Sequence, residues 1–243
     1  SGTTWTQQSK LTAPDGATND SFGRGVSVSG DTAIVGASSD DVGANASQGS
    51  AWVFSRVGPA WIGADQQLVA SDGAAGDFYG FSVAISGDTA IVGAFNDTVT
   101  STQQGSAYVY VRSGMIWIQQ AQLTASDSAL GDFFGTSVAI SGDTAIVGAN
   151  GDDVGANNGQ GSAYVFVRSG TTWTQQAKLT ASDGAGNDFF GYSVALDGDT
   201  AIVGAYADDV GANTDRGSAY VFVRSGTTWT QQAKLTSSDG AAN

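Results

Sequence analysis

Four short β runs recur along the chain, each bounded by Gly, Asp, Asn or Ser. In the last copy they read FGYSVAL (190–196), TAIVGA (200–205), SAYVFVR (218–224) and TTWTQQAKLT (227–236). The second run is apolar on both faces, which is typical of a strand sandwiched between neighbours. The fourth run alternates, with Trp229, Gln231 and Ala233 on one face and polar residues on the other. We therefore predict that the second strand is an inner strand of the unit and the fourth an outer one.

The connections between these runs predict antiparallel pairing. SGDT or DGDT joins the first run to the second, and RSGTT joins the third to the fourth in the last copy; both are short hairpin signals. The hairpin glycines, which we expect at positive φ, are Gly30, Gly87, Gly142 and Gly198. No stretch combines helical periodicity with caps. The predicted fold is all-β.

The unit is repeated in tandem. Trp5, Trp61, Trp117, Trp173 and Trp229 recur every 56 residues, which gives four full periods. Tandem four-stranded units of this size are typical of β-propeller blades, and a flat stack of sheets or a β-solenoid is the alternative. We predict one propeller or propeller segment over 1–243, with an extra outer strand at 1–16 and blades at 20–72, 77–128, 132–184 and 188–240.

One fourth run is surplus to the four blades. The chain starts with SGTTWTQQSKLT, before any first run, and SGTTWTQQAKLT follows the last third run. We predict that Thr3 to Thr12 pair with the third strand of another blade. That pairing would close a ring within the chain or join two chains by strand exchange.

The charge and the composition exclude several classes of partner and several kinds of catalytic group. The formal net charge is −14, all 23 acidic residues are Asp, and 9 Lys and Arg oppose them. Nucleic acid and anionic membrane are therefore disfavoured as partners, and cationic partners or metal ions are favoured. Cys and His are absent, which removes disulfides, thiol nucleophiles and the usual neutral-pH base. No apolar run is long enough to cross a bilayer, so no membrane insertion is expected.

Each copy carries an aromatic-Gly pair, then a Gly-Ala pair, then a Gly before the third run. These are Phe22-Gly23, Gly36-Ala37 and Gly49; Tyr79-Gly80, Gly93-Ala94 and Gly105; Phe134-Gly135, Gly148-Ala149 and Gly161; Phe190-Gly191, Gly204-Ala205 and Gly217. The pattern resembles the FG-GAP repeat of integrin α-chain heads and of bacterial surface proteins. The resemblance implies a propeller that is secreted or at the cell surface, with a protein or a glycan as its partner.

The chain departs from the integrin pattern at two places. The Pro of GAP is replaced by Ser38, Phe95, Asn150 or Tyr206. The calcium loop that integrin-like blades often carry between the first two strands is reduced here to SGDT or DGDT. One Asp in a two-residue turn cannot supply six to eight oxygen ligands, so this calcium site is not carried over.

Most of the acidic residues lie in the longer loops, which the meander places at one end of the blades. Asp20, Asp77, Asp132 and Asp188 each precede the Gly of an aromatic-Gly pair by three residues, and we expect them to cap that loop. The alternative is a calcium site that each of these Asp would form with a neighbouring DD-loop Asp. The calcium candidates are Asp20, Asp77, Asp132, Asp188, Asp41, Asp153 and Asp209. No other cofactor is predicted.

Three further features have structural explanations. The DDVGAN loops at 40–45, 152–157 and 208–213 are expected to be solvated turns, and the second copy lacks the motif. The Trp of each fourth run is expected to pack between blades rather than to stack on sugar. The acceptor sequences at Asn19, Asn45 and Asn96 match N-glycosylation, which chance explains in so Asn-rich and Ser-rich a chain.

These observations predict a non-catalytic extracellular interaction or adhesion module that presents an acidic loop face. A strand-exchanged homo-oligomer or filament is the first alternative. A propeller polysaccharide hydrolase or lyase that uses paired Asp is the second. Against the enzyme, every Asp recurs from copy to copy in a turn, whereas an active site is usually built once.

Overall fold

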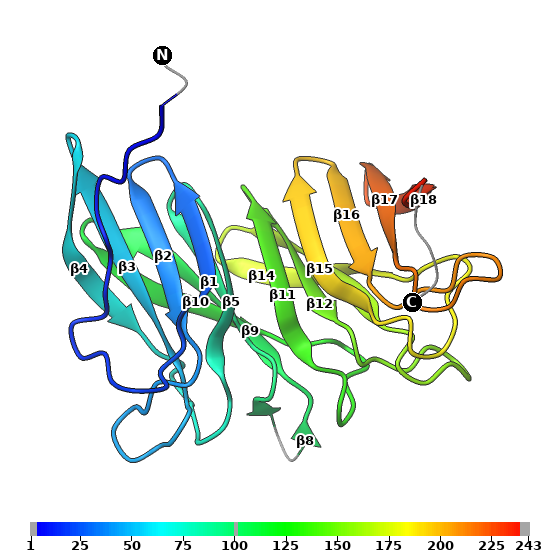
Figure 1. The fold of residues 1–243 in the computed structure, drawn as a ribbon, viewed down its shortest axis with the longest axis horizontal. Coiled ribbons are helices and arrows are strands. Elements are labelled where there is room, and N and C mark those ends of the chain that lie inside the picture. Colours follow the sequence, from blue (N-terminus) through cyan, green and yellow to red (C-terminus); the bar gives the residue numbers. More distant parts are fainter. Residues whose placement is uncertain (1–3, 100–101, 239–243) are drawn as a thin grey trace.

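The computed structural model describes residues 4–99 and 102–238 (Figure 1). These residues form four four-stranded antiparallel sheets and one two-stranded hairpin, and they contain no helix that could cross a membrane. We call each four-stranded sheet a blade. The predicted all-β class and the four-stranded unit are confirmed.

The strands follow the predicted runs closely. Blade 1 contains β1 (Phe22–Ser29), β2 (Thr32–Ala37), β3 (Ser50–Val57) and β4 (Ala60–Leu68). Blade 2 contains β5 (Tyr79–Ser86), β6 (Thr89–Ala94), β9 (Ser106–Ser113) and β10 (Ile116–Leu123). Blade 3 contains β11 (Phe134–Ser141), β12 (Thr144–Ala149), β13 (Ser162–Ser169) and β14 (Thr172–Leu179). Blade 4 contains β15 (Phe190–Asp197), β16 (Thr200–Ala205), β17 (Ser218–Ser225) and β18 (Thr228–Leu235). The hairpin of β7 (Thr98–Val99) and β8 (Thr102–Gln103) lies in the loop before β9.

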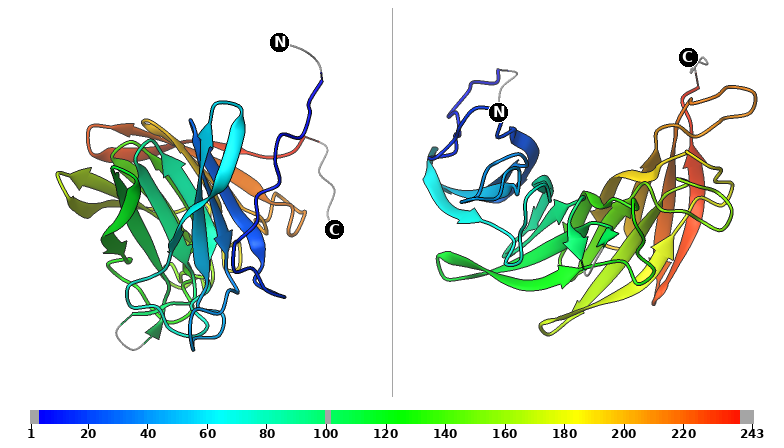
Figure 2. Two further views of the ribbon diagram at one scale, coloured as in Figure 1. Left: turned by 90° about the vertical axis from the view of Figure 1, so that its left-hand side faces the viewer. Right: turned by 90° about the horizontal axis from the view of Figure 1, so that it is seen from below.

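The blades pack face to face in an open arc. The first strands β1, β5, β11 and β15 contact one another in that order. Figure 2 shows the four sheets fanning out from this inner side, with blade 1 and blade 4 at the two ends of the arc. The described strands do not close a ring, so the closure expected of a complete propeller stays a prediction.

Identical sequences show how packing between blades decides burial. TAIVGA forms β2, β6, β12 and β16, and every residue of the first three strands is buried. In β16 burial alternates, because one face of blade 4 has no blade against it. Ile202 is accordingly 37% exposed, whereas its counterparts Ile34, Ile91 and Ile146 are fully buried. The prediction that the second strand is sandwiched is confirmed for β6 and β12, which have a blade on both sides, and for β2, whose outer face packs against Leu11 and Ala13.

The glycines of the repeated motif lie at the contacts between blades. A Cβ on Gly36 would overlap the carbonyl oxygen of Gly80 in the next blade, and Gly93 meets Gly135 in the same way. Gly80 and Gly135 themselves have φ of 86° and 94°, which bulkier residues rarely adopt. The aromatic-Gly pair of one blade therefore rests on the Gly-Ala pair of the blade before it.

The segment 1–16, predicted as an extra outer strand, contains no strand among its described residues, and its pairing with another blade stays a prediction. Residues 4–13 belong to no strand and run along the outward face of blade 1 (Figure 1). Leu11 and Ala13 pack there against the cluster that contains Val35 and Phe54. The segment has the side chains of an outer strand but no third strand beside it to supply ladder hydrogen bonds. Thr3 lies outside the described residues, and pairing with another chain stays a prediction.

Candidate interaction face at the loop end

The meander separates two kinds of connection. The short hairpins between first and second strands, and between third and fourth strands, lie at one end of each blade, which we call the hairpin end. The longer connections lie at the other, which we call the loop end (Figure 1). The hairpin glycines Gly30, Gly87, Gly142 and Gly198 have φ of 58°, 58°, 57° and 54°, as predicted. This topology sorts the charged residues into two groups.

At the hairpin end, turn aspartates are paired with arginine. Nε of Arg168 donates to Asp143 at 2.7 Å, and its guanidinium carbon lies 5.3 Å from the ring centroid of Trp173. The guanidinium also reaches Thr89 of the preceding blade, at 3.1 Å. The equivalent ion pairs are Asp31 with Arg56, Asp88 with Arg112, and Asp199 with Arg224. Apart from Asp197, the aspartates at this end are therefore balanced by arginine.

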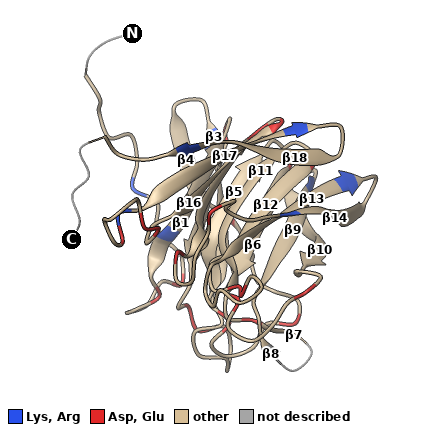
Figure 3. Cartoon of the chain, turned by 90° about the vertical axis from the view of Figure 1, so that its right-hand side faces the viewer, with Lys and Arg blue, Asp and Glu red and all other residues tan. Residues whose placement is uncertain are grey.

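The loop end carries a buried and an exposed set of aspartates (Figure 3). The buried set is Asp20, Asp40, Asp77, Asp97, Asp132, Asp152, Asp188 and Asp208. The exposed set is Asp15, Asp41, Asp72, Asp127, Asp153, Asp183, Asp209 and Asp215. Asp239 lies outside the described residues. The predicted acidic loop face is thus present, and the two sets have different roles.

The Asp before each aromatic-Gly pair caps its own loop, as expected. Oδ2 of Asp77 accepts the backbone N–H of Ala74 at 2.5 Å, and Asp132 accepts that of Ala129 at 2.6 Å. Asp20 and Asp188 make the same bond to the residue three positions earlier. These carboxylates hold the chain where it turns into the first strand.

The second Asp of each DD loop closes a separate turn. Oδ1 of Asp153 accepts the backbone N–H of Gly159 at 2.8 Å, and Val154 and Asn157 pair across the loop. Asp41 and Asp209 repeat this arrangement with the N–H groups of Ser47 and Asp215. The DDVGAN loops are therefore ordered Asp-capped turns whose remaining surface is exposed. Asn45, one of the acceptor asparagines, donates to Gln48 and to the Gly73 carbonyl, so its amide is engaged in packing.

The first Asp of each DD loop, and Asp97 at the equivalent position of the second copy, belong to a network that the sequence did not predict. The Tyr108 hydroxyl oxygen lies 2.8 Å from a carboxylate oxygen of Asp97 and 2.8 Å from one of Asp72, so its single proton can be donated to either, and it joins blade 2 to the loop that leaves blade 1. In blades 3 and 4 a lysine joins the network. Nζ of Lys178 contacts Asp127 and Asp152, each at 2.7 Å. The sequence signal that could have revealed this network is the recurrence of Asp, Tyr and either Lys or Gln at fixed positions in successive repeats.

Burial and ion pairing shift the pKa values of the loop-end carboxyl groups in opposite directions. Burial raises the pKa of Asp77 and of Asp132 from 3.8 to about 6, although the loop N–H bonds oppose this shift. Burial likewise raises the pKa of Asp188. The hydrogen bond from Lys234 is the main cause that lowers the pKa of Asp183. For Asp127, bonds from Lys178 and Tyr164 outweigh the effect of burial and lower the pKa.

The seven candidate aspartates can be compared with the coordination that a calcium ion requires. Calcium takes six to eight oxygen ligands. The residues that the structure describes contain no group of three or more acidic, His or Cys side chains that could hold a metal. All seven candidates already accept a loop N–H, as described above. The donor set does not form a calcium cage, and calcium binding at these aspartates stays a prediction.

The Trp residues of the fourth runs in blades 2, 3 and 4 pack between blades, as expected, whereas Trp61 packs on the outward face of its own blade. Trp117 is buried in the cluster that joins blades 1 and 2, while Trp173 and Trp229 are partly buried against the next two clusters. Nε1 of Trp173 donates to Gln120 of blade 2 at 2.9 Å. Trp5 differs from them, because it is 98% exposed.

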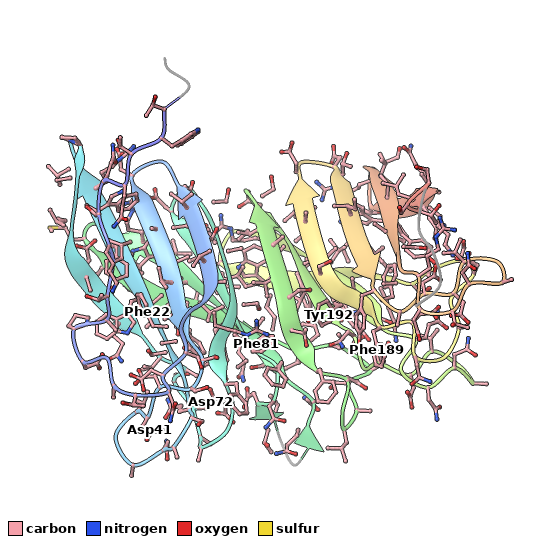
Figure 4. The ribbon with its side chains drawn as sticks, in the orientation of Figure 1. Phe22, Asp41, Asp72, Phe81, Phe189 and Tyr192 are labelled. Atoms are coloured by element: carbon pink, nitrogen blue, oxygen red, sulfur yellow. The ribbon has the colours of Figure 1, made fainter. Side chains whose placement is uncertain are left out.

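An aromatic cluster near the loop end was also missed. Phe78 stacks on Phe95 with centroids 5.4 Å apart, and Phe81 and Phe133 contact the same ring. The guanidinium carbon of Arg24 lies 4.0 Å from the Phe81 centroid. We call Phe78, Phe81, Phe95 and Phe133 the aromatic ledge. A second cluster of Phe189, Tyr192 and Tyr206 occupies the equivalent place in blade 4 (Figure 4).

The phenylalanines before the aromatic-Gly pairs adopt an unusual backbone conformation. Phe78, Phe133 and Phe189 have φ of 55°, 57° and 55°, a region that bulky residues rarely occupy. Such a residue persists where the surrounding structure fixes it, and functional surfaces are common places for it. The aromatic ledge is therefore a fixed, partly exposed surface that already accommodates one guanidinium.

The fold and these sites define a tandem-repeat all-β protein in which each blade rests on the glycines of the one before it. Comparison with protein families agrees: the FG-GAP repeat model matches residues 5–54, 63–110, 117–166 and 173–222. The chain belongs to the FG-GAP repeat family. No curated protein matched the chain.

The matched repeats are offset from the blades. Residues 117–166 include the fourth strand of blade 2, β10, and the first three strands of blade 3. Each family repeat therefore supplies the outer strand of one blade and the inner strands of the next. This offset explains why residues 5–13, which begin the first repeat, form an outer-strand sequence without a blade.

Proposed function

We propose that this chain is a non-catalytic interaction module of a secreted or cell-surface protein, and that its loop end binds a cationic partner protein. Membership of the FG-GAP repeat family supports a protein-interaction or adhesion role. The observation that carries the choice of partner is the sorting of charge between the two ends of the blades.

Aspartates at the hairpin end are mostly neutralised by arginine within each blade. At the loop end, among the residues that the structure describes, no lysine or arginine lies within ion-pair distance of the exposed carboxylates of Asp41, Asp72 and Asp153. Uncompensated charge on one face raises the local concentration of cationic ligands and speeds their association. The loop end is thus suited to basic surfaces.

The aromatic ledge supports the same class of partner. Arg24 lies over Phe81 at a distance at which a guanidinium is attracted to the face of a ring. Phe133 is 37% exposed and Tyr206 of the second cluster is 53% exposed, so further ring surface is accessible beside the acidic loops. Arginine or lysine side chains of a partner would find both a carboxylate and an aromatic face there.

The hydrolase or lyase alternative has less support. A glycosidase needs one carboxyl group as acid and a second as base or nucleophile, both facing the substrate. Here the carboxyl groups with raised pKa, Asp77 and Asp132, are buried and bound to loop N–H groups. The same arrangement recurs in each blade, which fits a structural role.

The strand-exchanged scaffold remains the alternative assembly. Residues 1–12 and 225–236 differ at one position, Ser9 against Ala233. Residues 4–13 lie outside every sheet. A segment with the side chains of β18 and no ladder partner is available for pairing with the third strand of another chain.

The partner proposal can be tested with a fluorescent octalysine peptide as the probe and octaglutamate as the negative control. The variant Asp41→Asn/Asp153→Asn/Asp209→Asn removes loop-end charge, while each Asn oxygen can still accept the loop N–H. The matched control, Asp65→Asn/Asp143→Asn/Asp197→Asn, removes the same charge elsewhere. We expect affinity to fall at least about tenfold in the first variant, and all affinities to weaken with salt. Equal losses in both variants would contradict the proposal.

A further inference from the structure

The two end blades of the arc carry complementary faces. We call the outward face of blade 1, with Val26, Val28 and Trp61, the leading face. We call the outward face of blade 4, with Ile202, Gly204 and Leu235, the trailing face. Within the chain, a trailing-type face meets a leading-type face at each of the three junctions between blades. These junctions show which kind of face packs against each of the two within the chain.

The trailing face is exposed apolar surface. Leu235 is 47% exposed, whereas Leu68, Leu123 and Leu179 are 1%, 4% and 4% exposed under the next blade. Thr200 is exposed, while its counterparts Thr32, Thr89 and Thr144 are buried. On the leading face, Val26 and Val28 are 68% and 63% exposed, and their counterparts in blades 2 and 3 are nearly buried.

Glycine also leaves room on the trailing face. Gly36, Gly93 and Gly148 are in backbone contact with the aromatic-Gly pair of the next blade, so a side chain there would clash. At Gly204 an added Cβ would meet only Ser193 of its own blade. Gly204 and Gly217 line a groove together with Tyr206 and Leu235. At a junction within the chain, the equivalent glycines Gly148 and Gly161 contact Gly191 and Phe190, the aromatic-Gly pair of the next blade.

The polar groups of the two faces also match. The Ser137 hydroxyl donates to the Gly191 carbonyl of the next blade at 2.7 Å, and Ser193 is the equivalent donor on the trailing face. Its acceptor in an incoming blade would be Gly23. The bond from Arg224 to Thr144 of the preceding blade corresponds in the same way to Arg56 and Thr200.

Residues 4–13 occupy part of the leading face. Leu11 and Ala13 pack on blade 1 as Leu68 and Ala70 pack on blade 2. They thus take the place of the last residues of a preceding outer strand. The rest of the segment is separated from Val26 and Val28 by a groove that Trp5, Gln7 and Gln8 line. The segment therefore covers the position that the outer strand of a preceding blade would occupy on blade 1. It leaves uncovered the positions that the inner strands of such a blade would occupy.

We propose that the trailing face of one chain binds the leading face of a second copy, and that residues 4–13 compete for the position which β18 of the incoming copy occupies. The contact is heterologous, because two different faces meet. It produces a closed ring if the arcs match and a filament if they do not. The trailing face shares Tyr206 with the second aromatic cluster but includes none of the loop-end aspartates, and the inference does not depend on the proposed partner.

Leu11→Asp in the full chain tests the competition, because it detaches the segment without altering either blade face. We expect the association constant, measured by sedimentation equilibrium, to rise about tenfold, because detaching the segment uncovers the surface under one partly buried leucine. Strand exchange through residues 3–12 predicts instead that Leu11→Asp lowers the association constant, because Leu11 would then be needed in the exchanged strand. A fall in association would overturn the proposal.

The trailing face is tested in the Leu11→Asp background with Ile202→Asp and, separately, Gly204→Val. We expect both to abolish association and to leave the thermal midpoint nearly unchanged, since neither side chain packs against another blade. Met115→Asp is the matched control, because Met115 is 91% exposed in a hairpin outside both faces. A chain that is monomeric in every variant would overturn the proposal, as would association that survives Ile202→Asp.

Discussion

Gly148 of blade 3 lies against the backbone of Gly191 in blade 4, so closely that a Cβ on Gly148 would overlap the Gly191 carbonyl oxygen. The hydroxyl of Ser137 donates to that same carbonyl. One glycine from the Gly-Ala pair and one from the aromatic-Gly pair therefore set how closely two blades approach.

Gly148→Ala should destabilise the chain by about 1 to 3 kcal/mol, because a methyl group there forces blades 3 and 4 apart. Gly204→Ala is the matched control, since its Cβ would meet only the rotatable Ser193 hydroxyl. Urea denaturation of both variants measures the difference. If the two substitutions cost the same, the glycine contact does not set blade spacing.

Trp117→Ala should cost roughly 3 to 5 kcal/mol in the free energy of unfolding, since the side chain is buried between blades 1 and 2. Trp5→Ala removes the repeat-equivalent side chain from an exposed position and should change stability by only a few tenths of a kcal/mol. Chemical denaturation compares them. A small effect at Trp117 would exclude a core role and favour an exposed binding platform.

Lys178 bridges Asp127 and the buried Asp152. Lys178→Met leaves the Asp152 carboxylate buried without its cation and should cost about 3 to 5 kcal/mol. Lys178→Gln should cost much less, because Gln122 already bonds to Asp97 and Tyr108 in blade 2. Thermal unfolding at neutral pH ranks the two variants, and equal losses would show that the amide cannot replace the ammonium group.

Stability should depend on pH in two opposite steps. The folded-state pKa of Asp77 and of Asp132 is about 6, above the ordinary 3.8, so the folded state takes up protons first. The chain should therefore become more stable as pH falls from about 7 to about 5. Below 3.8 it should lose stability, because Asp127 and Asp183, whose pKa is lowered, give up their lysine pairs.

Thermal midpoints between pH 7.5 and pH 3 measure both steps. Asp132→Asn should flatten the upper step, because an amide has no proton to take up. Asp65→Asn, at an exposed position on β4, is the control and should leave the curve unchanged. A midpoint that falls steadily from pH 7 to pH 5 would contradict this assignment.

Several features followed from local sequence. Alternation in the fourth runs and apolar TAIVGA runs marked the strands, and SGDT marked hairpins at which glycine takes positive φ. The capping role of Asp77 and Asp132 followed from short-range chemistry, because a carboxylate three residues from a backbone N–H can reach it in almost any turn. Such contacts need no knowledge of the neighbouring blade.

Only the tertiary structure decided what joins the blades. The Tyr108 hydroxyl meets Asp72, and Phe95 meets Phe133, across positions that are far apart in sequence and close only after blades stack. Residues 4–13 show the same limit. Their sequence is that of an outer strand, but a strand needs a ladder partner, and none lies beside them in the described structure. Local sequence thus fixed the strands and turns, whereas packing between blades decided which of these equivalent side chains are buried.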